Sequence, residues 1–446
     1  MSSLTRRRFI LSSVMLLPVL ANSETIKQEL YVPENSKDEL GVNLFAYGKK
    51  LSIIQGATSY HTTQIAVLVS TNSKFSYTLI DSSGINYKGH LSRKSRSNSK
   101  SAVDQISFTE LPSATDFIFE VRDQSNDLID QRTLKTFNES QKDIKIALAS
   151  CMSDMIIFNT KKIWEGLRQE NPDVIFFLGD NVYAGHNEQV SPEKMWDRYV
   201  ETRSALGIFK SPNLIPIFAT WDDHDFGQNN GDKSYAYIPE AQQIFRDFFP
   251  QDILDSTLHA GIGIGQSLTL FGRKFLFLDD RSFRDAPNGE SMWGAEQEAW
   301  LSKHLINAKT PVWIINGSQI FGKYGPSESL EKDFPKQFDR LTHFLKSINT
   351  PLTFISGDIH ASEVMKISFE IIGQEALEIT SSSMHSLRNP FDSLKENPRR
   401  VAGFYGDNFI NVMIDAFQDE RSMHLESFDT DHVKVFELNR SEVTPF

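Results

Sequence analysis

Five short apolar runs, each followed at once by polar residues, constrain the fold of this chain more than any other feature of its sequence. The clearest is Val174–Leu178, which predicts a strand buried on both faces, as in a parallel sheet covered by helices. Gly179 then allows a turn. Asp180 follows, and it places a carboxylate at the carboxyl edge of the sheet, where open α/β folds bind their ligands. The other four runs are residues 144–149, 214–219, 275–278 and 352–355.

The residues that follow these runs predict a site for several metal ions. Cys151, the only cysteine, follows the first run, and the later runs lead into acidic and histidine-containing segments at 221–225, 279–281 and 356–360. We expect these residues to converge on one sheet edge, where clustered carboxylates repel each other unless cations neutralise them. Asp180 is the best candidate for a carboxylate that bridges two ions. Cys151 is either a small buried apolar residue or a thiolate metal ligand.

The same segments resemble the alkaline phosphatase D (PhoD) family of metallophosphoesterases in both content and order. The resemblance implies an α/β fold with a two-sheet metallophosphoesterase core, an α/β/β/α sandwich, preceded by a small all-β, immunoglobulin-like domain. It also implies hydrolysis of phosphate esters outside the cytoplasm with iron (Fe3+) and calcium (Ca2+). The matching motifs are Ser-Cys at 150–151, Gly-Asp-x-x-Tyr at 179–183, Trp-Asp-Asp-His-Asp at 221–225, Leu-Asp-x-Arg at 278–281 and Ser-Gly-Asp-Ile-His-Ala at 356–361.

The family pattern implies roles for individual residues of these motifs. Tyr183 takes the place of a phenolate ligand of iron, although a loop tyrosine is ordinarily a packing residue. Asp223 takes the place of the asparagine that ligates the second metal ion in the wider superfamily; the alternative for this segment is a solvated acidic turn. The implied metal ligands are therefore Cys151, Asp180, Tyr183, Asp223, Asp358 and His360.

Two further residues are expected to act on the substrate. His224 is the predicted general acid that protonates the leaving oxygen, because it directly follows Asp223 and a histidine titrates in a useful range. Arg281 is a candidate phosphate clamp, since a guanidinium matches phosphate oxygens in bidentate fashion; the alternative is an exposed salt bridge. Either Asn229 or Asn230 is a candidate to lend a carbonyl to calcium, and the sequence does not decide between them.

The first two dozen residues read as an export signal. Arg6 and Arg7 precede a modest apolar segment, and residues 21–23 offer small side chains for cleavage, so residues 1–23 resemble a twin-arginine signal peptide. An ordinary secretory signal is the alternative. The apolar segment is short and is interrupted by Pro18, so we expect no membrane span in the mature protein. The export machinery would then carry it to the periplasm or the extracellular space.

Two domains are expected after the signal. Residues 24–141 contain short alternating strands bounded by turn residues, which predict a β-sandwich. Residues 142–446 alternate strands and helices, as expected for an α/β catalytic domain. The strand-like runs between 409 and 438 are expected to complete its second sheet.

The expected function is that of an exported metal-dependent hydrolase of phosphoric monoesters or diesters, in which metal ions activate a hydroxide for attack on the substrate.

The 46 basic and 58 acidic residues leave a net charge of −12, which disfavours broad polyanion binding, and we expect no nucleic-acid-binding domain. No Gly-x-Ser-x-Gly, His-Glu-x-x-His or P-loop motif indicates another hydrolase. The alternative is a non-catalytic exported binding protein with a structural metal site. The sequence decides neither the natural substrate nor the oligomeric state.

Overall fold

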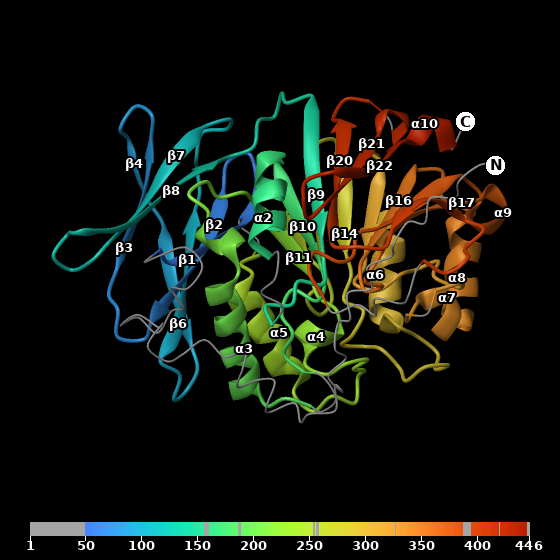
Figure 1. Cartoon of the computed structure of the whole chain (residues 1–446), viewed down its shortest axis with the longest axis horizontal. Helices are drawn as coiled ribbons and strands as arrows, with labels where there is room; N and C mark the ends of the chain where they lie inside the picture. Colours follow the sequence, from blue (N-terminus) through green and yellow to red (C-terminus); the bar gives the residue numbers. More distant parts are fainter. Residues whose placement is uncertain are drawn as a thin grey trace, which may run out of the picture.

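The computed structural model describes residues 50–155, 160–185, 189–252, 255, 258–325, 327–386, 394–418 and 420–443. The predicted signal peptide and residues 24–49 of the predicted β domain lie outside the described residues. Two small sheets precede a core of two larger sheets and several helices (Figure 1). The α/β fold class with an all-β N-terminal region is therefore confirmed. In the described part of the chain no helix is long and apolar enough to cross a membrane.

The N-terminal region is a sandwich of two four-stranded antiparallel sheets, at the left of Figure 1. Side chains from both sheets, such as Val67 and Phe119, form one apolar core between them. Strands β1 and β2 are buried on both faces, because Ile54 and Ala66 on the other face pack into the helical layer of the α/β core. The strands are β1 Ser52–Thr58, β2 Thr63–Ser70, β3 Ser76–Asp81, β4 Asn86–Lys88, β5 His90–Ser95, β6 Ser101–Phe108, β7 Asp116–Arg122 and β8 Leu128–Lys135.

The first core sheet contains three of the predicted apolar runs as neighbouring parallel strands, in the order β11-β10-β9-β20-β21-β22. Helix α2 (Thr160–Gln169) connects β9 to β10. The C-terminal strands extend this sheet, so the expectation that they complete the second sheet was wrong. Strand β20 pairs antiparallel with β9 from Asp143 to Leu148 and so satisfies the backbone groups of an edge that would otherwise be unpaired. The strands are β9 Asp143–Ala149, β10 Val174–Leu178, β11 Ile217–Thr220, β20 Asn408–Asp415, β21 His424–Asp429 and β22 Lys434–Asn439.

The second core sheet has eight strands in the order β12-β13-β14-β15-β16-β18-β17-β19. Its centre, β14-β15-β16-β18, is parallel, and the strands at both sides pair antiparallel. The two remaining apolar runs form β14 and β16. The strands are β12 Leu258–Ala260, β13 Gln266–Leu270, β14 Arg273–Phe277, β15 Val312–Ile315, β16 Leu352–Ser356, β17 Ser362–Ile367, β18 Ala376–Thr380 and β19 Arg400–Phe404.

The two sheets pack face to face, with helices on both outer faces. Phe176 of β10 meets Phe277 of β14 between the sheets, with ring centroids 5.1 Å apart. The side chains next to these two in sequence point away from the other sheet: Phe177 packs into one helical layer and Leu276 into the other. The helices are α2 Thr160–Gln169, α3 Pro192–Ala205, α4 Asp223–Phe226, α5 Ile238–Phe248, α6 Gly294–Ile306, α7 Leu330–Asp333, α8 Pro335–Leu345, α9 Phe369–Ile372 and α10 Arg440–Val443, with 3-10 turns η2 Gly207–Lys210 and η3 Glu420–Ser422.

Helix α3 joins the sandwich to the core. Its buried Arg203 donates to the carbonyl oxygen of Phe248 at 2.7 Å and to that of Ala66 in β2 at 3.1 Å. The last sandwich strand ends at Lys135 and the first core strand begins at Asp143. We therefore propose a domain boundary in this connection, in keeping with the division between residues 141 and 142 expected from the sequence.

Candidate metal centre

Four of the predicted metal ligands lie just beyond strand ends, with their backbone in the left-handed region. The φ angles are 52° at Cys151, 51° at Asp180, 72° at Asp358 and 52° at His360. A residue with a Cβ atom avoids this conformation, which costs about 1–2 kcal/mol. Such strain is kept where a site requires it. The strands before these residues therefore end in sharp turns, which direct the chain across the ends of the two core sheets.

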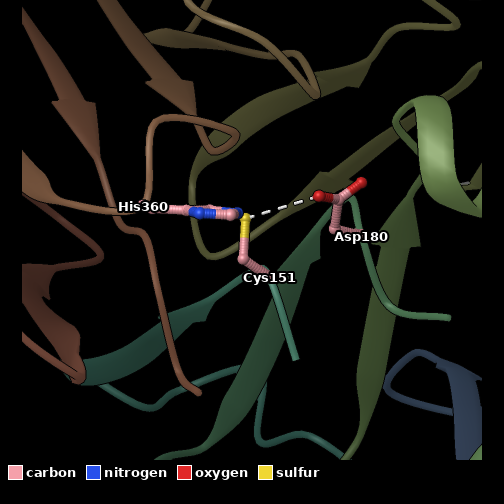
Figure 2. Close-up of side chains that lie close together, drawn as sticks. All are labelled: Cys151, Asp180 and His360. Atoms are coloured by element: carbon pink, nitrogen blue, oxygen red, sulfur yellow. Dashed lines mark hydrogen bonds between the residues drawn. The ribbon is translucent and has the colours of Figure 1, made fainter. Parts of the chain in front are cut away.

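The first group of potential ligands brings together both core sheets. Figure 2 shows Cys151 after β9 and Asp180 after β10, with His360 from the turn after β16 beside them. One donor atom of each lies within 4.8 Å of the others, and Cys151 Sγ is 3.7 Å from Asp180 Oδ2. The Tyr183 hydroxyl is 3.5 Å from His360 Nε2. The structure thus brings four of the predicted ligands to one point.

The second group contains Asp180 again, together with Asp223 and His224, whose donor atoms also lie within 4.8 Å of one another. Asp223 accepts hydrogen bonds from the backbone N–H of His224 at 2.9 Å and of Asn230 at 2.6 Å. Asn230 therefore contacts the group through its backbone. Because Asp180 belongs to both groups, its carboxylate lies between them.

The orientation of His224 is fixed by its neighbours. Its ring stacks on that of Tyr183, with centroids 4.3 Å apart and an interplanar angle of 29°. Its Nδ1 lies 2.6 Å from the carbonyl oxygen of Gly185. A carbonyl can only accept, so Nδ1 carries the hydrogen. Nε2 is then the ring atom with which His224 can bind a metal ion or transfer a proton.

Burial and mutual repulsion disfavour the ionised forms of Asp180, Asp358 and Cys151 when no cation is bound. Burial and then Asp223 raise the pKa of Asp180 well above its ordinary value, and the same two causes raise the pKa of Asp358 to about 8. Burial and then Asp180 raise the pKa of the Cys151 thiol. For Asp223 burial is again the largest single cause and raises the pKa, but Arg281, His224 and the hydrogen bonds from Asn230 and Asp180 together outweigh it and lower the pKa to about 2. Bound cations would relieve the remaining repulsion.

The donor set fits more than one kind of metal ion. A thiolate, a phenolate and an imidazole suit a transition metal such as ferric iron, whereas carboxylate oxygens suit calcium. The Oδ2 atom of Asp358 is buried and has no hydrogen-bond partner among the described residues, as expected for an oxygen that ligates an ion. Asp358 and His360 are each partly exposed, so this side of the centre is open to solvent.

Arg281, the predicted phosphate clamp, is fully buried. Its guanidinium donates to Asp222 Oδ1 at 2.5 Å and to Glu328 Oε2 at 2.8 Å. Glu328 is also bound by Arg284 at 2.7 Å. Arg281 thus makes buried salt bridges behind the segment that carries Asp223, and its action on a phosphate stays a prediction.

Two residues that the sequence analysis did not single out connect the predicted ligands. The Asp225 carboxylate accepts from the backbone N–H groups of Val182 at 2.9 Å and Asn181 at 3.2 Å, so it ties the loop after β10 to the segment after β11. The Ser382 hydroxyl donates to Cys151 Sγ at 3.1 Å. Asp225 belongs to a recognised motif, but a serine in the run 381–383 carries no signal of its own in the sequence.

Two facing sheets between helical layers, with thiol, carboxylate and imidazole groups at the carboxyl ends of strands from both sheets, define a metallophosphoesterase-type fold. A family model described as PhoD-like phosphatase matches residues 146–407, more than half of the chain. The chain therefore belongs to the PhoD-like phosphatase family.

Two known proteins are similar to this chain. Alkaline phosphatase D of Bacillus subtilis (strain 168) is 27% identical over 338 residues, which cover 60% of this chain and 56% of that protein. The match thus spans about half the length of the curated relative. A solved structure described as "Structure of PhoD" has a TM-score of 0.64 and 17% sequence identity, and the superposition covers 87% of this chain and 88% of that one. This second similarity establishes a shared fold.

The Arg281→Ala variant should lose about 3–5 kcal/mol of unfolding free energy, because removal of one partner leaves buried carboxylates without compensation. Urea denaturation measures the loss. Arg340→Ala is the control, since its ion pair with Glu298 is 49% exposed on the arginine side and should contribute less than about 1 kcal/mol. A variant that unfolds like the wild type but binds inorganic phosphate less tightly would identify Arg281 as a phosphate ligand instead.

Proposed function

We propose that the protein is an exported, metal-dependent phosphoric ester hydrolase of the alkaline phosphatase or phosphodiesterase type. The observation that carries the proposal is the position of Asp180 in both groups of potential ligands. A carboxylate shared between two groups is suited to hold two metal ions near each other, as in sites that clamp both oxygens of an in-line displacement at phosphorus. Family membership and the relation to alkaline phosphatase D support the same reaction.

Cys151, Tyr183 and His360 would hold ferric iron, Asp223 and Asp358 would provide oxygen ligands for calcium, and Asp180, which belongs to both groups, would contribute to both sites. When bound, such ions supply positive charge for the phosphate oxygens and lower the pKa of a water molecule towards about 7. Because Asp180 and Cys151 are buried, the charge that they contribute acts with little screening by solvent.

His224 would donate a proton to the leaving oxygen. The contact between Nδ1 and the Gly185 carbonyl and the stacking on Tyr183 hold the ring in one orientation. The ring is thereby held beside Asp223, which reduces the side-chain entropy lost at the moment of reaction. Substrate would approach on the side of Asp358 and His360, which are partly exposed.

The exposure of the site distinguishes the proposed hydrolase from the alternative, a binding protein with a structural metal site. Structural sites are coordinatively closed by protein ligands, whereas catalytic sites keep a position for substrate. The partial exposure of Asp358 and His360 favours the second kind. The chemistry of the site does not separate monoesters from diesters, so both stay within the proposed substrate class.

We propose export by the twin-arginine pathway on the basis of residues 1–23. This pathway carries folded proteins, which suits a centre whose ligands come from both core sheets and that is assembled only in the folded chain.

The protein as isolated should contain iron with calcium, and Cys151→Ala should lose most of its iron together with its activity. Metal analysis measures the content. A phenolate-to-iron charge-transfer band in the visible spectrum reports Tyr183 as a ligand, because a phenolate transfers electron density to ferric iron. Ser153→Ala serves as a control in the same loop. Full iron content and full activity in Cys151→Ala would contradict the role of this thiol.

The His224→Ala variant should lose about 10²- to 10⁴-fold in kcat on an alkyl phosphate ester, whose leaving oxygen needs a proton. The loss should be much smaller on p-nitrophenyl phosphate, because its leaving anion is already stable. Steady-state kinetics on both substrates, with metal content measured in parallel, make the comparison. His343→Ala, at an exposed position of α8, is the control. Equal losses on both substrates at unchanged metal content would exclude the general-acid role, and loss of metal would make His224 a ligand.

Substitution of both Arg6 and Arg7 by lysine should abolish export, since twin-arginine recognition depends on the pair. Cell fractionation followed by detection of the processed chain measures the effect. Arg8→Lys, at the next position, should leave export intact. Continued export of the double variant through the general secretory machinery would refute this route.

A further inference from the structure

The segment after β18 lies across the ends of both core sheets and connects two potential metal ligands. The backbone N–H of Ser381 donates to the carbonyl oxygen of Ser356 at the end of β16, at 3.0 Å. Its side chain donates to the carbonyl oxygen of Leu148 in β9, at 2.8 Å. Cys151 follows β9 and His360 follows β16, so this segment sets the relative position of two ligands from different sheets.

A single hydroxyl at the centre of this segment contacts both ligands. Ser382 Oγ donates to Cys151 Sγ at 3.1 Å and accepts from the backbone N–H of His360 at 2.9 Å. A serine hydroxyl has one hydrogen and two lone pairs, so these two contacts use its donor and one of its acceptor positions. Ser382 is fully buried, and the described side chains around it leave it inaccessible to bulk water.

Ser382 is also the better of the two hydroxyl donors near this sulfur. Ser150 Oγ lies 3.5 Å from Cys151 Sγ, but it is 2.7 Å from the carbonyl oxygen of Ser381. Its one hydrogen is therefore directed to the carbonyl. The sulfur thus depends on Ser382 for its hydrogen bond from a hydroxyl group.

We propose that Ser382 is a positioning residue for the metal centre: its hydroxyl orients the Cys151 sulfur, withdraws electron density from it and fixes its distance to His360. This inference rests on the proposed metal-dependent function. Hydrogen bonds to a ligating sulfur tune the electronics of a bound metal, and groups that orient ligands contribute about 10- to 100-fold in metal affinity. In this proposal Ser382 acts through Cys151 and His360 and is not itself a metal ligand.

The test compares Ser382→Ala with Ser383→Ala in the full-length protein containing Fe3+. Ser383 is the adjacent residue and is also fully buried, and its hydroxyl has no hydrogen-bond partner among the described residues. Both variants lose one hydroxyl group, so the control reports the effect of truncation alone. Ser382→Thr keeps the hydroxyl and should restore wild-type behaviour.

Two measurements that do not depend on activity decide the outcome. EDTA should remove iron from Ser382→Ala about 10-fold faster or more than from Ser383→Ala. The thiolate-to-iron band should move to longer wavelength, because a sulfur without its hydrogen bond holds its electrons less tightly. Equal rates and equal spectra in the two variants would overturn the role of Ser382 while leaving the proposed function intact. A wild-type protein that holds no thiolate-bound iron would overturn both.

Discussion

Repulsion between buried carboxylates is the constraint on which the rest of this structure depends. Asp180, Asp222, Asp223 and Asp358 repel one another at the common end of two sheets, and burial of the first three limits screening of their charge by water. The protein meets part of this cost itself, since Arg281 is buried between Asp222 and Glu328. The remaining charge faces Cys151 and His360, on the side where metal ions would bind. Arg281 thus compensates part of the acidic cluster, and under the proposed function metal ions would compensate the rest.

The two-sheet architecture explains why the predicted metal ligands come from so many segments. Parallel strands of one sheet end at one edge, so β9, β10 and β11 bring Cys151, Asp180 and Asp223 together. The second sheet packs against the first through Phe176 and Phe277, and this contact brings the turn after β16 to the same edge. The aromatic core between the sheets therefore determines the geometry of a polar site that it does not touch.

The sequence predicts the parts of this structure that depend on local patterns. Continuous apolar runs ending in polar residues identify β9, β10, β14 and β16. Residues that are neighbours in the sequence determine both the burial of each strand and the polar groups at its end. The pairing of β20 with β9 was not predicted correctly, because partner choice among strands depends on packing between residues far apart in the chain. Ser382 and Glu328 were missed for the same reason. Each acquires its role only when another segment folds beside it, and neither stands in a distinctive motif.

The left-handed backbone at Cys151, Asp180, Asp358 and His360 has an evolutionary consequence. Glycine adopts this conformation freely, and asparagine does so more readily than most residues, so replacement by either relieves strain and favours a more stable chain without metal. The same replacement removes a thiolate, carboxylate or imidazole from the centre. Under the proposed function, selection for stability and selection for function therefore act in opposite directions at these four positions. A lineage released from the need for catalysis should accumulate glycine or asparagine at these turns before it loses the fold, and such residues would mark inactive descendants.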